Sequence, residues 1–197
     1  RNEKNYFHFK NAEYCDNLRN SISVLDSSIN NIIPKIAEEI GGEDFSILQS
    51  SIQKQLDLID VLHESYQREA EITEKVRKEG RNLESFVSKD RHTSEITTSF
   101  VLHLRLLEKN YMLFRDKKSY FKLNEALLKI KDLTPICYRC APYIEAVHDL
   151  FRTYEKNEAL VNGIQINGNK MEEITGGIAS RERKRISTFF TKTKHFM

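Results

Sequence analysis

The feature that most constrains the fold is an apolar stripe with steps of three and four residues from Phe45 to about Leu128, with weak steps at Thr73 and Gly80. Its first turns carry Phe45, Leu48, Ile52, Leu56, Ile59 and Leu62. Steps of three and four place these side chains on one face of an α-helix. The stripe therefore predicts a helix over residues 45–131, which are 87 residues and would span about 130 Å at 1.5 Å per residue. A helix of that length needs a partner along its side to be stable in water.

A polar stretch interrupts the stripe at residues 88–94. Because it contains neither glycine nor proline, the sequence leaves two interpretations open. The stretch is either a loop that splits or kinks the long helix, or an exposed section of one continuous helix.

Two further helices are predicted on either side. Apolar spacing indicates the first over about residues 6–40, where Pro34 should kink or interrupt it and Gly41-Gly42 should end it. Residues 132–142 contain two prolines and predict a tip at which the chain reverses. A third helix is expected over 143–197, weakened by its Asn-Gly and Gly-Gly pairs.

The composition agrees with long helices. Only 7 glycines and 3 prolines occur in 197 residues, and 30% of the residues are charged, so turns are too scarce for β-sandwiches and barrels. Three helices of this length cannot bury their stripes alone. We therefore expect an all-α single domain over 1–197: an elongated antiparallel three-helix coiled coil that pairs with a second copy into a six-helix dimer.

The chain ends and the cysteines indicate a cellular setting. No run of 18 apolar residues and no signal peptide is present. The chain begins at Arg1 and ends while still periodic, so we expect it to be excised from a longer protein. Three cysteines do not make a disulfide framework, which favours a reducing, intracellular compartment.

Motifs for enzyme chemistry are weak. Cys137-x-x-Cys140 has the spacing of a zinc knuckle or a redox pair, but no second ligand pair and no strand–helix context accompanies it. We therefore interpret it as two ordinary residues of a turn. Glu145-x-x-His148 is half of a di-iron motif, and its nearest second copy, Asp60-x-x-His63, has the wrong carboxylate. We expect no enzyme, no metal and no cofactor.

Positive charge is concentrated in clusters although the net charge is only +2. Six basic residues against one acidic residue lie between Arg181 and Met197. Such clusters are either ordinary solvated helix faces or a surface for an anionic partner. No nucleic-acid-binding motif accompanies them, so we expect no nucleic acid. The aromatic residues on the stripes should pack in the core or at the dimer interface: Tyr66, Tyr111, Phe114, Phe121, Phe151 and Tyr154.

Three stretches resemble a known family. In residues 107–118, the apolar residues 111–114 are followed by Arg115, Lys117 and Lys118. Residues 120–129 approach the tip, and residues 181–190 are basic and then aromatic. This arrangement resembles the BAR domain of the sorting-nexin type. Pro34, the tip prolines and the glycines of the third helix depart from the family's usual pattern.

The resemblance implies a dimeric scaffold that binds membranes and senses or induces their curvature, as in endosomal sorting and membrane tubulation. It also implies a phosphoinositide-reading domain outside this chain. The partners would be an anionic phospholipid membrane and the same or a related chain as homo- or heterodimer. The location would be cytoplasmic, peripheral on endosomal or other intracellular membranes.

The predicted membrane-binding residues combine these clusters with the tip: Arg115, Lys117, Lys118, Lys129, Lys131, Arg139, Arg181, Arg183, Lys184 and Arg185. Each cation near an anionic leaflet contributes about 1 kcal/mol. The alternative function is a helical coiled-coil tether or adaptor subunit that acts through protein–protein contacts without binding membranes.

Overall fold

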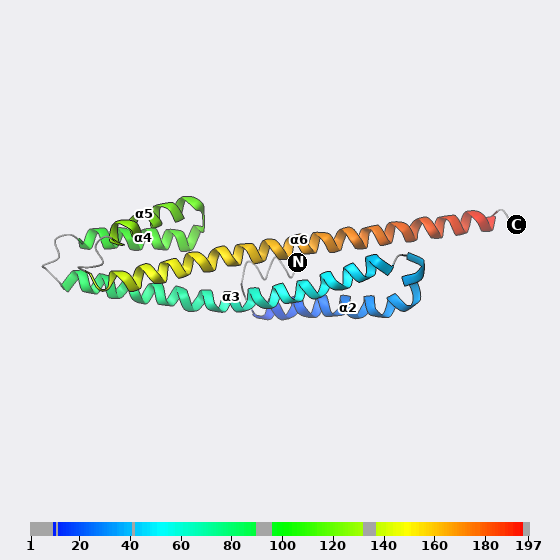
Figure 1. Cartoon of the computed structure of the whole chain (residues 1–197), viewed down its shortest axis with the longest axis horizontal. Helices are drawn as coiled ribbons and strands as arrows, with labels where there is room; N and C mark the ends of the chain where they lie inside the picture. Colours follow the sequence, from blue (N-terminus) through cyan, green and yellow to red (C-terminus); the bar gives the residue numbers. More distant parts are fainter. Residues whose placement is uncertain (1–9, 11, 41, 90–95, 132–136, 195–197) are drawn as a thin grey trace. The chain divides into compact units, whose positions relative to one another are not determined.

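The computed structural model describes residues 10, 12–40, 42–89, 96–131 and 137–194, with side chains left undescribed at 32–40 and 189–194. Over these ranges the protein is all-α, as the sequence predicts (Figure 1). The helices are α2 (Ala12–Ile40), α3 (Gly42–Lys89), α4 (Thr98–Phe114), α5 (Lys117–Lys131) and α6 (Cys140–Lys194).

Residues 45–131 do not form the single helix that the stripe predicts. The structure has three helices there, α3, α4 and α5. Between α4 and α5, Arg115 adopts a left-handed backbone with φ 52° and its N–H bonds to the carbonyl of Tyr111. Asp116 Oδ1 then accepts from the backbone N–H of Ser119 at 2.6 Å, which starts α5. The periodicity missed this break because neither glycine nor proline marks it.

The break near residues 88–94 falls partly outside the described residues, which stop at Lys89 and resume at Ile96. At the start of α4, the Thr97 hydroxyl accepts from the backbone N–H of Phe100 at 3.1 Å. This is an ordinary N-cap, so α4 begins as a helix of its own at Thr98.

The outer helices differ from expectation in continuity. Helix α2 runs through Pro34 instead of being interrupted there, and α6 runs unbroken through its Asn-Gly and Gly-Gly pairs. Pro142 lies in the first turn of α6, where its missing N–H costs little. Residues 6–9 and 11 of the first predicted helix and residues 132–136 of the predicted tip lie outside the described residues.

The chain divides into two compact units, to which α3 and α6 each contribute. Unit 1 comprises residues 1–64 and 158–197, and unit 2 comprises Ser65–Asn157. We describe each unit by itself.

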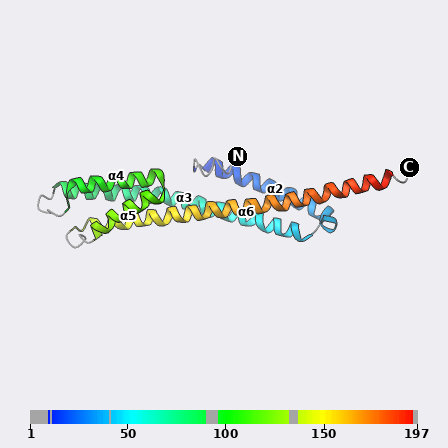
Figure 2. The same ribbon diagram turned by 90° about the horizontal axis from the view of Figure 1, so that it is seen from above.

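Unit 2 is a bundle of four antiparallel helical segments: the end of α3, all of α4 and α5, and the start of α6 (Figure 2). Its core is apolar and continuous, with fully buried side chains from all four segments that include Leu83, Leu104, Leu123, Leu127, Ile130 and Leu150. Tyr111 lies at an aromatic junction, 4.9 Å from the ring of Phe151 and 5.4 Å from that of Tyr154. From Ser65 onward, the stripe that predicted a long helix therefore packs the helices of unit 2 against each other.

In unit 1, the start of α3 contacts both α2 and the later part of α6. Its apolar core includes Leu18, Ile22, Ile29, Leu48, Ile52 and Ile59. Asn167 on α6 donates to the carbonyl of Ser51 at 2.7 Å and to Gln55 Oε1 at 2.8 Å. Gln55 in turn donates to the carbonyl of Ile164. This buried polar group fixes the register between α3 and α6, as buried amides do in coiled coils.

Candidate functional site

The outer face of α5 gathers positive charge within unit 2. Its inner face is set by Leu123, Ala126, Leu127 and Ile130, which are buried. Helical spacing leaves the other face exposed, and five lysines occupy it against one glutamate: Lys117, Lys118, Lys122, Lys129 and Lys131, with Glu125. We call these side chains, together with Phe121 and Leu128, the α5 face.

Two large apolar side chains lie on the same face. Phe121 is 65% exposed and Leu128 is 56% exposed. Their positions, seven residues apart, put them at nearly the same angle around the helix, with lysines on both sides. Leu113 and Phe114, immediately before the turn into α5, are exposed as well. Exposed apolar groups flanked by cations are the pattern of a helix that binds at a membrane interface.

The lysines of the α5 face differ in whether an ion pair holds them. Lys129 pairs with Glu125 at 3.0 Å, and both side chains are exposed, so this pair contributes little to stability. Lys117, Lys118 and Lys122 form no ion pair with any residue that the structure describes. Three cations therefore face solvent without a fixed intramolecular partner in that part of the chain.

Arg115 has a different role from its neighbours. Its guanidinium donates to Glu69 Oε1 at 2.8 Å and lies 4.2 Å from the ring centroid of Tyr154. Asn157 donates to the other oxygen of Glu69 at 2.7 Å. The side chain of Arg115 is thus held against the bundle, where it joins the α4–α5 turn to α3 and α6.

The remaining predicted cations are spread over both units. Arg139 lies just before α6, with its guanidinium 5.0 Å from the ring centroid of Tyr138. In unit 1, Arg181 pairs with Asp44 and Arg185 lies 3.9 Å from Glu182. Arg183 and Lys184 are exposed. The structure thus brings together Lys117, Lys118, Lys129 and Lys131 on one helix.

Sequence reasoning missed three members of the α5 face: Phe121, Lys122 and Leu128. Tyr66, Tyr111, Phe151 and Tyr154 are buried as expected, whereas Phe114 and Phe121 are exposed. Lys122 belonged to a visible basic cluster, so charge was the available signal. The exposed aromatics became recognisable only once α5 was known to be a separate helix with its own buried face.

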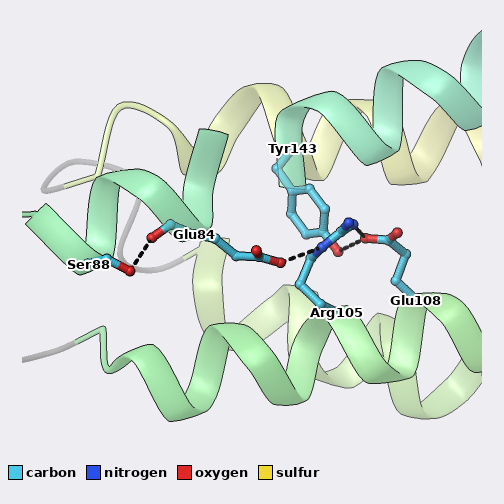
Figure 3. Close-up of polar contacts among 5 residues, drawn as sticks. All are labelled: Glu84, Ser88, Arg105, Glu108 and Tyr143. Carbon is cyan, nitrogen blue, oxygen red and sulfur yellow. Dashed lines mark hydrogen bonds and ion pairs between the residues drawn. The ribbon is translucent and has the colours of Figure 1, made fainter. Parts of the chain in front are cut away.

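A buried charged network lies inside unit 2 (Figure 3). Arg105 donates to Glu84 at 2.9 Å and pairs with Glu108, and the Tyr143 hydroxyl donates to Glu108 at 2.7 Å. Glu108 is only 1% exposed. This group joins α3, α4 and α6 through polar contacts at the centre of the bundle.

Burial and pairing act against each other in this network. Burial raises the pKa of Glu108, although Tyr143 and Arg105 oppose the shift. Burial, followed by the nearby Glu108 carboxylate, raises the pKa of Tyr143 well above its ordinary value. Burial alone would lower the pKa of Arg105, but Glu108 raises it. The network therefore holds the hydroxyl proton on Tyr143 and the charge on Arg105.

Gly80 makes room for Arg105. A Cβ on Gly80 would lie 2.7 Å from Arg105 Nε and closer still to the guanidinium carbon. A real Cβ essentially never comes that close, so with any other residue at position 80 the Arg105 guanidinium would have to shift from its place in the network. The weak step in the apolar stripe at Gly80 thus has a structural reason.

The Cys137-x-x-Cys140 interpretation needs correction. The spacing predicts two ordinary residues of a turn. The structure instead pairs the two cysteines as a disulfide, and both are buried. The disulfide closes the turn just before α6, where Cys140 N–H also bonds to the carbonyl of Cys137 at 3.0 Å. Among the residues that the structure describes, no three or more His, Cys, Asp or Glu side chains are grouped so that they could hold a metal ion.

Comparisons with known proteins add no assignment. Searches against protein-family models, curated proteins and solved structures found no match. Among the described residues, no helix is long and apolar enough to cross a membrane.

Proposed function

We propose that this protein binds the surface of anionic membranes through the α5 face. The observation that carries the proposal is the pairing of five lysines with two exposed apolar side chains on one helix of unit 2. Lysines alone would also fit a solvated surface. Phe121 and Leu128 favour a partner that offers both anionic groups and an apolar layer, which is the chemistry of a lipid headgroup region.

The expected energy supports reversible binding. Each lysine near an anionic leaflet contributes about 1 kcal/mol, so Lys117, Lys118 and Lys122 alone contribute roughly 3 kcal/mol at low to moderate salt. Insertion of Phe121 and Leu128 adds a term that salt does not screen. Binding should therefore weaken, but persist, at about 150 mM salt, where the Debye length is about 8 Å.

We further propose a dimeric scaffold of the BAR type, which senses or induces membrane curvature, as in endosomal sorting and tubulation. The support is the likeness of residues 107–129 and 181–190 to that family. Arg139, Arg183 and Lys184 would add membrane contacts, together with Arg181 and Arg185, whereas Arg115 would position the α4–α5 turn. In this proposal the elongated antiparallel coiled coil and its six-helix pairing are the assembled form on the membrane.

Vesicle co-sedimentation tests the α5 face. The variant Lys117→Glu/Lys118→Glu/Lys122→Glu should lose binding to phosphatidylserine-containing vesicles. The matched control Lys78→Glu/Arg81→Glu/Lys156→Glu makes the same charge change at exposed positions of α3 and α6 in the same unit and should retain it. Equal binding by both variants would refute the assigned face, and circular dichroism shows whether each variant is folded.

A second candidate function is a helical adaptor or tether. One observation favours it: Leu102 and Leu106 are exposed along one stripe of α4. Leucines without neighbouring lysine clusters fit the groove of a partner helix better than a lipid surface. Leu102→Ser/Leu106→Ser should abolish partner binding if the adaptor function holds, and should leave vesicle binding unchanged if the α5 face alone binds lipid.

A further inference from the structure

A hollow of about 360 Å³ lies where α3 ends and α6 begins in unit 2. Its lining comes from one face of α3 and from the turn before α6: Asn82, Ser85, Phe86, Lys89, Tyr138 and Arg139. The volume is within the range of small-ligand sites. It does not overlap the α5 face.

The charged side chains among the described lining residues of the hollow have one sign. Lys89 and Arg139 supply two cations, and the described lining residues include no acid. Within the described chain, neither cation forms an ion pair. The Ser85 hydroxyl adds a neutral donor, whereas Asn82 already donates to Glu79 at 3.1 Å. The hollow is therefore suited to an anion that accepts several hydrogen bonds.

The wall of the hollow is held in place. The rings of Phe86 and Tyr138 meet edge to face, with centroids 5.1 Å apart. Tyr138 and Arg139 are the two residues between Cys137 and Cys140, so the disulfide closes the loop that carries them. Because the loop is fixed before a ligand arrives, less conformational entropy is lost when Arg139 binds.

From this geometry we propose that the hollow binds a phosphate monoester between Lys89 and Arg139. A monoester carries a charge of about −1.5 to −2 at pH 7 and three acceptor oxygens, which matches two cations and one hydroxyl. A phosphate diester, with one charge and its oxygens partly esterified, uses fewer of these donors. The hollow should therefore prefer phosphate monoesters to diesters, whereas the distributed charge of the α5 face should not distinguish them.

The phosphate can belong to a soluble molecule or to a lipid. For the lipid source the inference rests on the proposed membrane binding, whereas for the soluble source it stands alone. Two probes separate the sources: soluble inositol trisphosphate, and phosphatidylcholine vesicles that carry a phosphatidylinositol phosphate. The reference vesicles reach the same surface charge with phosphatidylserine, whose phosphate is a diester.

Two variants of the full chain make the test specific. Lys89→Ala/Arg139→Ala removes both cations of the hollow. Arg81→Ala/Lys156→Ala is the matched control, because it removes one arginine and one lysine at exposed positions of α3 and α6 outside the hollow. Calorimetric titration with inositol trisphosphate should show an affinity loss on the order of a hundredfold in the first variant and little change in the control.

Each outcome either supports or overturns phosphate binding in the hollow. Loss of inositol trisphosphate binding in Lys89→Ala/Arg139→Ala alone supports the hollow, and a matching loss of preference for phosphoinositide vesicles assigns the phosphate to a lipid. A loss confined to inositol trisphosphate assigns it to a soluble molecule. The inference is overturned if the wild type neither binds inositol trisphosphate nor prefers phosphoinositide vesicles, or if both variants bind alike. Binding to phosphatidylserine vesicles would then still stand, so the two proposals fail separately.

Discussion

Both units bury polar side chains between their helices, but the buried groups differ in charge. At the centre of unit 2 lie a buried ion pair, Arg105 with Glu108, and the hydroxyl of Tyr143. In unit 1 the corresponding buried polar group is neutral, made by Gln55 and Asn167. A buried charge is costly without its partner, whereas a buried amide costs less. The stability of unit 2 should therefore be more sensitive to single substitutions than that of unit 1.

Helix α6 shows a second difference between the units. In unit 2 its stripe is buried, with Tyr143, Val147 and Leu150 fully covered. In unit 1 no described residue of α6 from position 168 to 188 is buried. The apolar spacing continues across both regions, so periodicity indicates which face of a helix is apolar but not what covers it.

The largest expected effect is at Gly80. Gly80→Ala should displace Arg105 and leave Glu108 buried without its pair, and breaking such a pair costs about 3–5 kcal/mol. The gain in helix propensity is only about 1 kcal/mol. Denaturant unfolding followed by circular dichroism measures the loss.

Gly176→Ala is the control for that substitution. A Cβ on Gly176 in α6 meets nothing within 4 Å, so this change should raise the free energy of unfolding by about 1 kcal/mol or less. If both alanine variants were stabilised, the network would not depend on Gly80.

The neutral group of unit 1 should respond less. Asn167→Ala leaves Gln55 without its partner and should cost about 1–3 kcal/mol. The double variant Gln55→Leu/Asn167→Leu removes both polar groups and should cost less than the single one. Chemical denaturation of the two variants compares them, and a double variant that is the less stable of the two would contradict this account of the group.

The disulfide should stabilise unit 2 alone. Removing a crosslink around so short a loop costs about 2 kcal/mol in the chain-entropy account. Cys137→Ser/Cys140→Ser should therefore raise hydrogen exchange in the first turns of α6 and leave exchange around Ile52 in unit 1 unchanged. Equal changes in both units would show that the crosslink does not act locally.

The smallest expected effect is a pH dependence from Glu108. Burial raises the pKa of its carboxyl above the ordinary 4.5, so the folded protein holds this proton more tightly than the unfolded chain. Its contribution to stability is fully present below pH 4.5 and is lost as the pH rises through the folded-state pKa. The stability of the wild type relative to Glu108→Gln should therefore fall with rising pH, and a constant difference would contradict the raised pKa.

The sequence predicted part of this structure for identifiable reasons. Apolar spacing gave the helical class and most buried positions, such as Leu62 and Leu83, because burial follows helical period. It could not give the α4–α5 break, which depends on the left-handed backbone of Arg115. Nor could it give the Arg105 network or the disulfide, because both depend on which helices pack together.

The same limit applies to the candidate site. A basic cluster predicted Lys117 and Lys118 of the α5 face, and their place near the expected tip predicted Lys129 and Lys131. Phe121 was expected in the core or at the dimer interface because a stripe along one long helix has a single apolar side. Once α5 is a separate short helix, its buried face is fixed by Leu123 and Leu127, and Phe121 lies outside it.

The most direct test of the central proposal is the depth of Phe121 at a membrane. Spin labels introduced through Phe121→Cys and, as a reference, through Arg152→Cys on the exposed side of α6 report their surroundings on phosphatidylserine-containing vesicles. The account predicts that the label at position 121 becomes accessible to oxygen dissolved in the lipid and protected from a water-soluble relaxation agent, while the label at 152 stays in water. If the label at 121 remains as accessible to water as the label at 152 while the protein is vesicle-bound, the α5 face is not the membrane-binding surface.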